Sequence, residues 1–339
     1  MTLQKQKLPQ KSSMKPTTGQ LLFGWFSIFC LLLIFKNSTL ANLYIQRGLQ
    51  LCAQTVIPSL FPFMVLSEIL ISGGFGEHVV GTLSRPLCNL FRLPATALCA
   101  MLLGILCGFP VGARGIAKAY RNGTLSKEDA EWVLPFANLP SPAFVIGVIG
   151  TSLWHSTRFG IVLYLCVTSC SLILEIFLSR IKKKKKDCSS FFSISDRSLC
   201  CVSGTRLFTD SMVSATAGIL SVCAYVVFFS AFMGAIEAIF LRFSAPSVIF
   251  SGLSCILELS QGVSTASELH TYPSALLCAF ACGWSGCSVH CQVISSCDGL
   301  GLSFRNYFFL KLLLGILCVL LFAVLIACFP WLLISPKIG

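Results

Sequence analysis

The sequence predicts an all-α, polytopic membrane protein, and two observations carry this prediction. Of the 339 residues, 55% are hydrophobic and only 11% are charged, whereas soluble domains carry roughly 25% charged residues. Several apolar runs also approach or exceed the roughly 20 residues that span the hydrocarbon core of a bilayer. We expect a multi-pass protein of the cell membrane with about eight to ten membrane-embedded helices, including broken or re-entrant segments that do not cross completely.

The apolar runs define the expected helices in chain order. The clearest are Leu21–Phe35, Ile161–Ile181, Met212–Phe240, Ala275–Ile294 and Phe304–Ile334. The first run follows a lysine-rich end and could therefore belong to a signal peptide. Lys36, Asn37 and Ser38 follow it, however, and they do not form a small-residue cleavage site. We interpret this run as an uncleaved anchor.

The formal net charge of +12 comes from cations that stand in blocks beside apolar runs. One block lies in the basic N-terminus, residues 1–20, and another is Lys182–Lys186. The positive-inside rule places both blocks in the cytoplasm, where they also attract anionic lipid. Membrane lipids are therefore the expected partners, and nucleic acid is not.

The second basic block also divides the chain. We predict a first membrane half at residues 21–181, a basic linker at 182–206 and a second membrane half at 207–335. Each half contains an apolar helix with an acid, Glu68 or Glu237, and later an apolar run interrupted by glycine. Chance similarity between apolar segments is the alternative. Paired Gly/Pro-interrupted segments nevertheless point to a carrier with internal repeats.

The interruption in the first half is the stretch GILCGFPVGARG. Pro110 removes a backbone donor, and Gly108 and Gly112 flank it closely. Unsatisfied backbone groups in lipid cost several kcal/mol, so such a break is tolerated only inside protein or beside water. We predict a broken or re-entrant helix here. In the second half, we predict the same for CGWSGCSVH, with Gly283 and Gly286 at the interruption.

Three cations follow the first interruption at helical spacing. Arg114, Lys118 and Arg121 are four and three residues apart, so they share one helix face. That face should meet water, lipid headgroups or an anionic solute, and a solvated surface is the simplest interpretation.

Polar side chains beside the interruptions are the candidate substrate-binding residues. Pro140 and Pro142 prevent a regular helix around two of them, and others lie in the stretch LELSQG. Ionisable groups within membranes are expensive and suggest function, although an acid there can instead satisfy a helix end. The predicted set is Asn138, Ser141, Glu258, Ser260, Gln261 and Gln292.

Neither a metal site nor a catalytic site is expected. The 19 cysteines are scattered through apolar runs, where cysteine behaves as a small hydrophobic residue. Their densest cluster, from Cys278 to Cys297, lacks an evident set of converging ligands. The sequence has no H-E-x-x-H, G-x-S-x-G or Walker A motif. We therefore expect no cofactor and no enzyme activity.

Five stretches carry a family resemblance. In order they are LQLCAQTVIPSLFPFMVLSEIL, LLGILCGFPVGARGIAKAYRNGTLSKEDAE, FANLPSPAFVIGVIG, LELSQG and CGWSGCSVHCQVI. Together they resemble the YlbJ-type sporulation integral membrane proteins of the wider nucleoside-recognition, or Gate, group. The resemblance implies a role in endospore formation, including assembly of the spore cortex. It also implies kinship with concentrative nucleoside transporters, whose broken helices bind the solute.

Two departures from the family pattern concern the candidate site. The family's Cys-Asn-Asn-Ala-Gly-Pro is replaced by Ala137-Asn138-Leu139-Pro140-Ser141-Pro142, which loses one amide. Its Glu-Met-Thr-Asn-Gly is replaced by Glu258-Leu259-Ser260-Gln261-Gly262, which moves another amide by one methylene. These changes imply a shifted solute identity or affinity.

Two functions follow as expectations. The first is a carrier or channel that binds or moves a small polar, nucleoside-like solute between two related halves. The second is a non-transporting membrane scaffold for assembly of the spore envelope or cortex. An oligomer is compatible with either function.

Overall fold

The computed structural model describes residues 18–73, 86–181, 203–244 and 246–333, and every regular element in these ranges is helical. Residues 1–17 of the predicted basic N-terminus, and the block Lys182–Lys186, lie outside the described residues. Six helical stretches are long and apolar enough to cross a membrane. They are α1 (Thr18–Lys36), the continuous α2–η1–α3 (Ser38–Ser72), α8 (Thr157–Ile181), α9 (Gly204–Arg242), α12–α13 (Tyr272–Ser296) and α14 (Arg305–Cys328). The protein is an all-α, multi-pass membrane protein.

Large apolar side chains cover much of the outer surface, as expected where lipid replaces water. Helix α1 has no buried residue at all, and Trp25 and Phe35 are 69% and 82% exposed. The interior contains many small residues, including Ala97, Ala113 and Ala137, each fully buried. Small side chains allow helix backbones to approach closely in the absence of a hydrophobic driving force.

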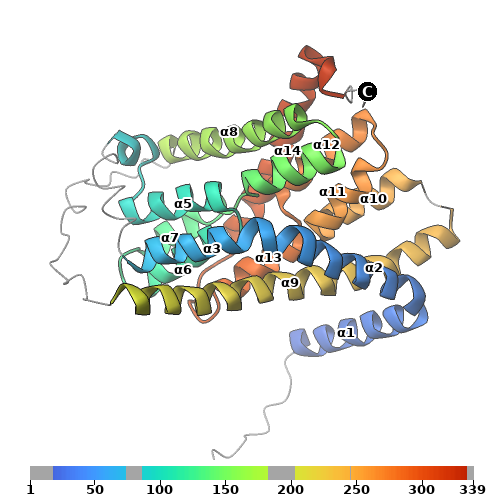
Figure 1. Cartoon of the computed structure of the whole chain (residues 1–339), viewed down its shortest axis with the longest axis horizontal. Helices are drawn as coiled ribbons and strands as arrows, with labels where there is room; N and C mark the ends of the chain where they lie inside the picture. The colour runs from blue at the N-terminus through green and yellow to red at the C-terminus, as the bar shows by residue number, and fades with distance from the viewer. Residues whose placement is uncertain (1–17, 74–85, 182–202, 245, 334–339) are drawn as a thin grey trace, which may run out of the picture.

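The helical elements follow the same order twice along the chain. In each case a long helix is followed by a helical hairpin, a broken helix and a second long helix (Figure 1). The first series is α2–η1–α3, hairpin α5 (Ala95–Cys107) and α6 (Val111–Arg121), broken pair α7 (Lys127–Val133) and η2 (Ala143–Leu153), then α8. The second series is α9, hairpin α10 (Ser247–Leu257) and α11 (Leu259–Ser267), broken pair α12 (Tyr272–Trp284) and α13 (Gly286–Ser296), then α14. The one-turn helix η4 (Pro330–Leu333) follows α14.

The first hairpin turns at Gly108 and grips the irregular segment between α7 and η2. A methyl group on Gly104 or on Gly112 would lie only 2.8 Å from the carbonyl carbon of Ala137. Gly108 itself has φ +81°, and a Cβ there would meet Ser141 at 2.8 Å. The predicted interruption at Gly108, Pro110 and Gly112 is therefore present. Because the chain reverses at Gly108, its two neighbouring glycines face each other across the hairpin.

The second hairpin turns at Glu258 and meets the break in α12–α13. Glu258 is extended, with φ −142° and ψ 123°, and separates α10 from α11. The break between α12 and α13 is at Ser285 and Gly286, which both have positive φ. A Cβ on Gly286 would lie 3.0 Å from the Leu259 nitrogen, so the hairpin tip rests on this break.

Gly283 does not belong to that interruption, contrary to the sequence-based expectation. It lies inside α12, where a Cβ would come within 2.8 Å of Gly315 Cα on α14. Its role is to let two helix backbones touch.

The two series of elements are held together by α9, which runs along α2 and α3 (Figure 1). A Cβ on Gly48 would lie 2.6 Å from Ser230 Oγ, and one on Gly234 would lie 2.9 Å from Ala41 Cα. On the other side, α8 packs against α14. The N-terminal and C-terminal series therefore share one interior.

The close packing of Gly104 and Gly112 against Ala137 gives a first test. We expect Gly112→Ala to lower the stability of the folded protein by about 2–3 kcal/mol, because the backbone of Ala137 cannot retreat from the new methyl group. Gly147→Ala in η2 is the matched control, since nothing lies within 4 Å of a Cβ there. Thermal unfolding in detergent measures both, and equal midpoints for the two variants would contradict the close packing.

Candidate functional site

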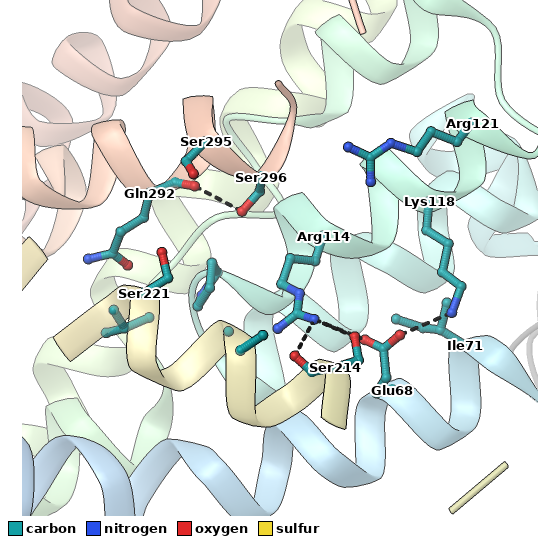
Figure 2. A pocket seen from close by; sticks show the side chains of 14 residues that line it. Glu68, Ile71, Arg114, Lys118, Arg121, Ser214, Ser221, Gln292, Ser295 and Ser296 are labelled. Carbon is teal, nitrogen blue, oxygen red and sulfur yellow. Dashed lines mark hydrogen bonds and ion pairs between the residues drawn. The ribbon is translucent and has the colours of Figure 1, made fainter. Parts of the chain in front are cut away.

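A cavity of about 470 Å³ lies where α3, α6, α9 and α13 meet (Figure 2). We name it the cationic cavity, because three cationic side chains line it against a single carboxylate, that of Glu68. The cations are Arg114, Lys118 and Arg121 from α6. Its other polar lining consists of Ser214 and Ser221 from α9, and Gln292, Ser295 and Ser296 from α13.

Arg114 is held in place by α9. Its Nη2 donates hydrogen bonds to the carbonyl oxygen of Ser214 at 2.8 Å and to the Ser214 hydroxyl at 2.7 Å. A Cβ on Gly218 would lie 2.9 Å from Arg114 Cζ, so the guanidinium occupies the space that a side chain would take. The same guanidinium lies 3.7 Å from Glu68 Oε2. Ser214 and Gly218, one turn apart on α9, thus form the binding site of the Arg114 guanidinium.

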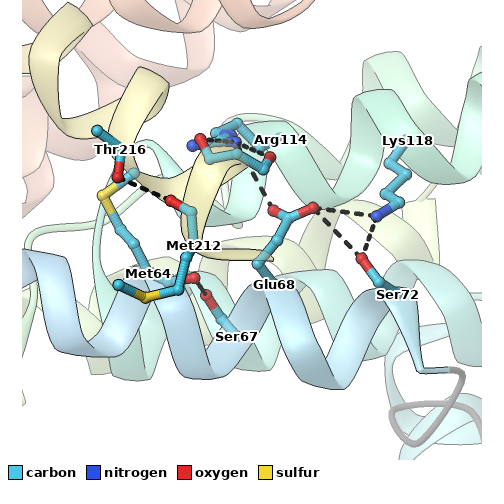
Figure 3. Close-up of polar contacts among 9 residues, drawn as sticks. Met64, Ser67, Glu68, Ser72, Arg114, Lys118, Met212 and Thr216 are labelled. Atoms are coloured by element: carbon cyan, nitrogen blue, oxygen red, sulfur yellow. Dashed lines mark hydrogen bonds and ion pairs between the residues drawn. The ribbon is translucent and has the colours of Figure 1, made fainter. Parts of the chain in front are cut away.

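Glu68 joins two of the three cations (Figure 3). Its Oε1 lies 3.0 Å from Lys118 Nζ, and Lys118 also donates to the Ser72 hydroxyl. The Glu68 side chain is 13% exposed, and those of Arg114 and Lys118 are 22% and 35% exposed. Arg121 donates instead to the backbone oxygen of Asp298, at 3.4 Å. The cavity therefore keeps an excess of positive charge after its internal ion pairs are formed.

A second, much smaller cavity of about 20 Å³ lies between the two hairpin tips. Its polar lining is Ser59, Ser141, Glu258, Ser260 and Gln292, and Phe109 from the first tip closes one side. This volume holds roughly one water molecule and no organic solute. Gln292 and Val222 line both cavities, so the small one lies directly behind the cationic one. We call it the tip cavity.

Four of the six predicted binding residues, Ser141, Glu258, Ser260 and Gln292, therefore line a single cavity. Asn138 and Gln261 do not line it. The Asn138 amide donates to Tyr307 Oη at 3.2 Å, and the Gln261 amide lies 3.5 Å from Ser230 Oγ. Asn138 follows Ala137, whose carbonyl packs between Gly104 and Gly112, and the Asn138 side chain points toward α14.

Glu258 satisfies a helix end, which is the structural alternative that the sequence left open for an acid within the membrane. Its Oε2 accepts a hydrogen bond of 2.6 Å from the Gln261 backbone nitrogen, so it caps the N-terminus of α11. A carboxylate is favoured there by the helix dipole and by the free N–H groups. The same carboxylate is 1% exposed and lines the tip cavity, so capping and a role in the site coexist.

The sequence reasoning overlooked the contribution of α9. Ser214, Gly218 and Ser221 lie in the apolar run Met212–Phe240, yet they line the cationic cavity. Their spacing of four and three residues is the signal that could have identified them, because it places small and polar residues on one helix face. The shared face of Arg114, Lys118 and Arg121 is confirmed, but it lines a cavity rather than an open solvated surface.

Comparison with known proteins gives one informative match, and no family model and no solved structure matches the chain. The "Sporulation integral membrane protein YlbJ" of Bacillus subtilis (strain 168) is 26% identical over 330 residues. The match covers 87% of this chain and 80% of that relative. The chain is similar to this sporulation integral membrane protein along most of its length. Because the similarity covers so much of the chain, it cannot be confined to one hairpin or to one of the two series of helices.

The ion-pair network of Glu68 gives a second test. Glu68→Gln should lower the free energy of unfolding by about 1 kcal/mol, since partly exposed ion pairs contribute little each. Asp210→Asn is the matched control, because Asp210 lies 3.8 Å from Arg206 and its side chain is 70% exposed. Chemical denaturation in detergent measures the difference, and a loss no greater than that of the control would contradict the network.

Proposed function

We propose that this sporulation-associated, YlbJ-type membrane protein binds a small solute that carries negative charge and moves it across the membrane. The observation that carries the proposal is the cationic cavity beside the first hairpin tip. Its volume of about 470 Å³ falls within the roughly 300–1,000 Å³ that is usual for small-molecule sites. Three cations face it against one acid.

The lining favours an anion over an uncharged solute. The guanidinium of Arg114 is hydrogen-bonded to Ser214 and packs into the space beside Gly218, so its orientation is pre-organised. A fixed guanidinium suits the bidentate oxygens of a carboxylate or phosphate. The serine hydroxyls of α9 and α13 can complete the hydrogen bonds of such a group. A neutral nucleoside-like solute would gain nothing from the excess charge.

The two cavities support a transport path with a closed and an open stage. The tip cavity is too small for a solute in this structure, and Phe109 and Pro110 of the hairpin tip separate it from the cationic cavity. Separation of the hairpin tips would join the two spaces past Gln292. Broken helices at the interface of two repeats are typical of carriers whose substrate binds near the midplane, as in the Gate-like arrangement that the sequence suggests.

The position along α9 indicates the side from which the solute is loaded. Ser214, Gly218 and Ser221 lie in the first half of α9, near its N-terminal end at Gly204. That end follows the lysine block at residues 182–186, which the positive-inside rule places in the cytoplasm. The cationic cavity would therefore accept its solute from the cytoplasmic side.

Reconstitution into liposomes tests the proposal. We expect saturable flux of at least one of radiolabelled succinate, benzoate or inorganic phosphate, and none of uridine. Arg114→Gln should lower that flux about tenfold or more, because it removes a charge-assisted bidentate contact. Arg206→Gln is the matched control, since that side chain is 78% exposed and lies away from the cavity. Flux of uridine alone would overturn the anionic preference, and no flux or binding of any probe would overturn the carrier.

The scaffold remains the competing function, and a sporulation assay separates the two. In a spore-forming host that lacks its own copy, we expect wild-type protein and Arg206→Gln to restore heat-resistant spores. Arg114→Gln, expressed at the same level, should not restore them if solute movement is the function. Full resistance with Arg114→Gln and with Ser141→Ala would favour the scaffold.

A further inference from the structure

A second polar cluster lies outside both cavities and contains a fully buried lysine. Lys311 is in α14, six residues from its first residue, and its side chain is 0% exposed. Its Nζ donates a hydrogen bond of 2.9 Å to the backbone oxygen of Asn138. Asn138 is in the irregular segment between α7 and η2, which the first hairpin grips. The ammonium of one series of helices thus meets a free carbonyl of the other.

Two successive turns of α14 hold Asn138. Its side-chain amide donates to Tyr307 Oη at 3.2 Å, and its backbone oxygen accepts from Lys311, four residues further along α14. Tyr307 Oη also lies 3.0 Å from His290 Nδ1 on α13. Since the Asn138 amide donates to the tyrosine oxygen, the tyrosine hydroxyl can donate to the histidine. A chain of polar groups therefore links the irregular segment of the first broken helix to the second broken helix.

Among the residues that the structure describes, no carboxylate forms an ion pair with Lys311. Lys311 interacts electrostatically with the thiols of Cys282 and Cys318 and with the ring of His290. A buried charge without a partner is expensive and rarely persists without a function. The acceptor in this case is an unwound backbone carbonyl between the two parts of a broken helix, a group of the kind that carriers use to coordinate a coupling cation.

We propose that Lys311 is a tethered cation that takes the place of a bound Na⁺ at the first broken helix. The ammonium holds the irregular segment against α14 through the Asn138 carbonyl, as a coordinated metal ion would. The segment continues into Ser141, so the position of this carbonyl sets the position of a residue that lines the tip cavity. One consequence of this inference, that flux requires no Na⁺, rests on the proposed transport function.

A first experiment asks whether wild-type protein uses Na⁺. Thermal unfolding of the full chain in detergent is measured in NaCl and in choline chloride at equal ionic strength. We expect the same midpoint in both salts, and the same flux of the succinate, benzoate or phosphate probe in liposomes with and without a Na⁺ gradient. Stabilisation that is specific to Na⁺, or flux that depends on Na⁺, would overturn the proposal.

A second experiment removes the tethered cation and supplies it again from solution. Lys311→Ala should lower the unfolding midpoint by roughly 5 °C, because the Asn138 carbonyl loses its donor. Propylammonium, which restores the missing chain and its charge, should recover about half of that loss. Tetramethylammonium has no N–H donor and should recover none. Lys127→Ala, at a side chain 54% exposed, is the matched control and should respond to neither amine.

A purely structural lysine would give a different pattern. Lys311→Met preserves most of the apolar stem without the charge, and Lys311→Arg preserves the charge. We expect Lys311→Arg to keep the probe flux within about threefold of wild type, and Lys311→Met to fold but lose about tenfold in flux. Equal flux from the two variants would overturn the proposal. If wild-type protein moves none of the probes, the carrier function fails, and the thermal experiments still decide the role of Lys311.

Discussion

The structure depends on one constraint, that a backbone carbonyl or N–H within the membrane must find a partner inside the protein. The chain is interrupted at Gly108, between α7 and η2, at Glu258 and at Ser285. Each hairpin tip is placed against the break of the broken helix in its own series. The breaks are thereby shielded from lipid, and backbone groups beside them bond to the side chains of Ser141, Glu258 and Lys311. Glycines at these contacts are required because a methyl group would separate the backbones.

Shielding the interruptions also concentrates polar groups in the interior of a protein whose outer surface is apolar. Ser141, Glu258 and Gln292 meet in the tip cavity although they come from three elements far apart in sequence. The cationic cavity adjoins it because α6 begins at the same hairpin tip and carries its cations along one face. A single feature of the backbone, the turn at Gly108, therefore positions both the closed space between the tips and the charged space beside it.

The cations of the cationic cavity and of α14 are bonded largely to neutral oxygen atoms. Arg114 is bonded to the carbonyl and hydroxyl of Ser214, Arg121 to the carbonyl of Asp298 and Lys311 to the carbonyl of Asn138. Glu68 is the carboxylate that forms ion pairs in the cationic cavity. Carbonyl dipoles support a cation without neutralising it. Positive charge therefore remains available, to a mobile anion in the cavity and to the irregular segment at Asn138.

The sequence by itself determined the class of protein, the apolar helices, the positions of three of the four interruptions and the common face of the α6 cations. These features follow from local chemistry, because apolar length, glycine and proline placement and helical spacing act over a few residues. The tertiary structure decided the rest. It showed that Gly283 serves a helix contact, that Asn138 faces Tyr307, and that α9 supplies the binding site of the Arg114 guanidinium. It also paired Lys311 with a carbonyl 173 residues away. Such partners depend on how distant helices dock, and the spacing of residues along one chain contains no record of that docking.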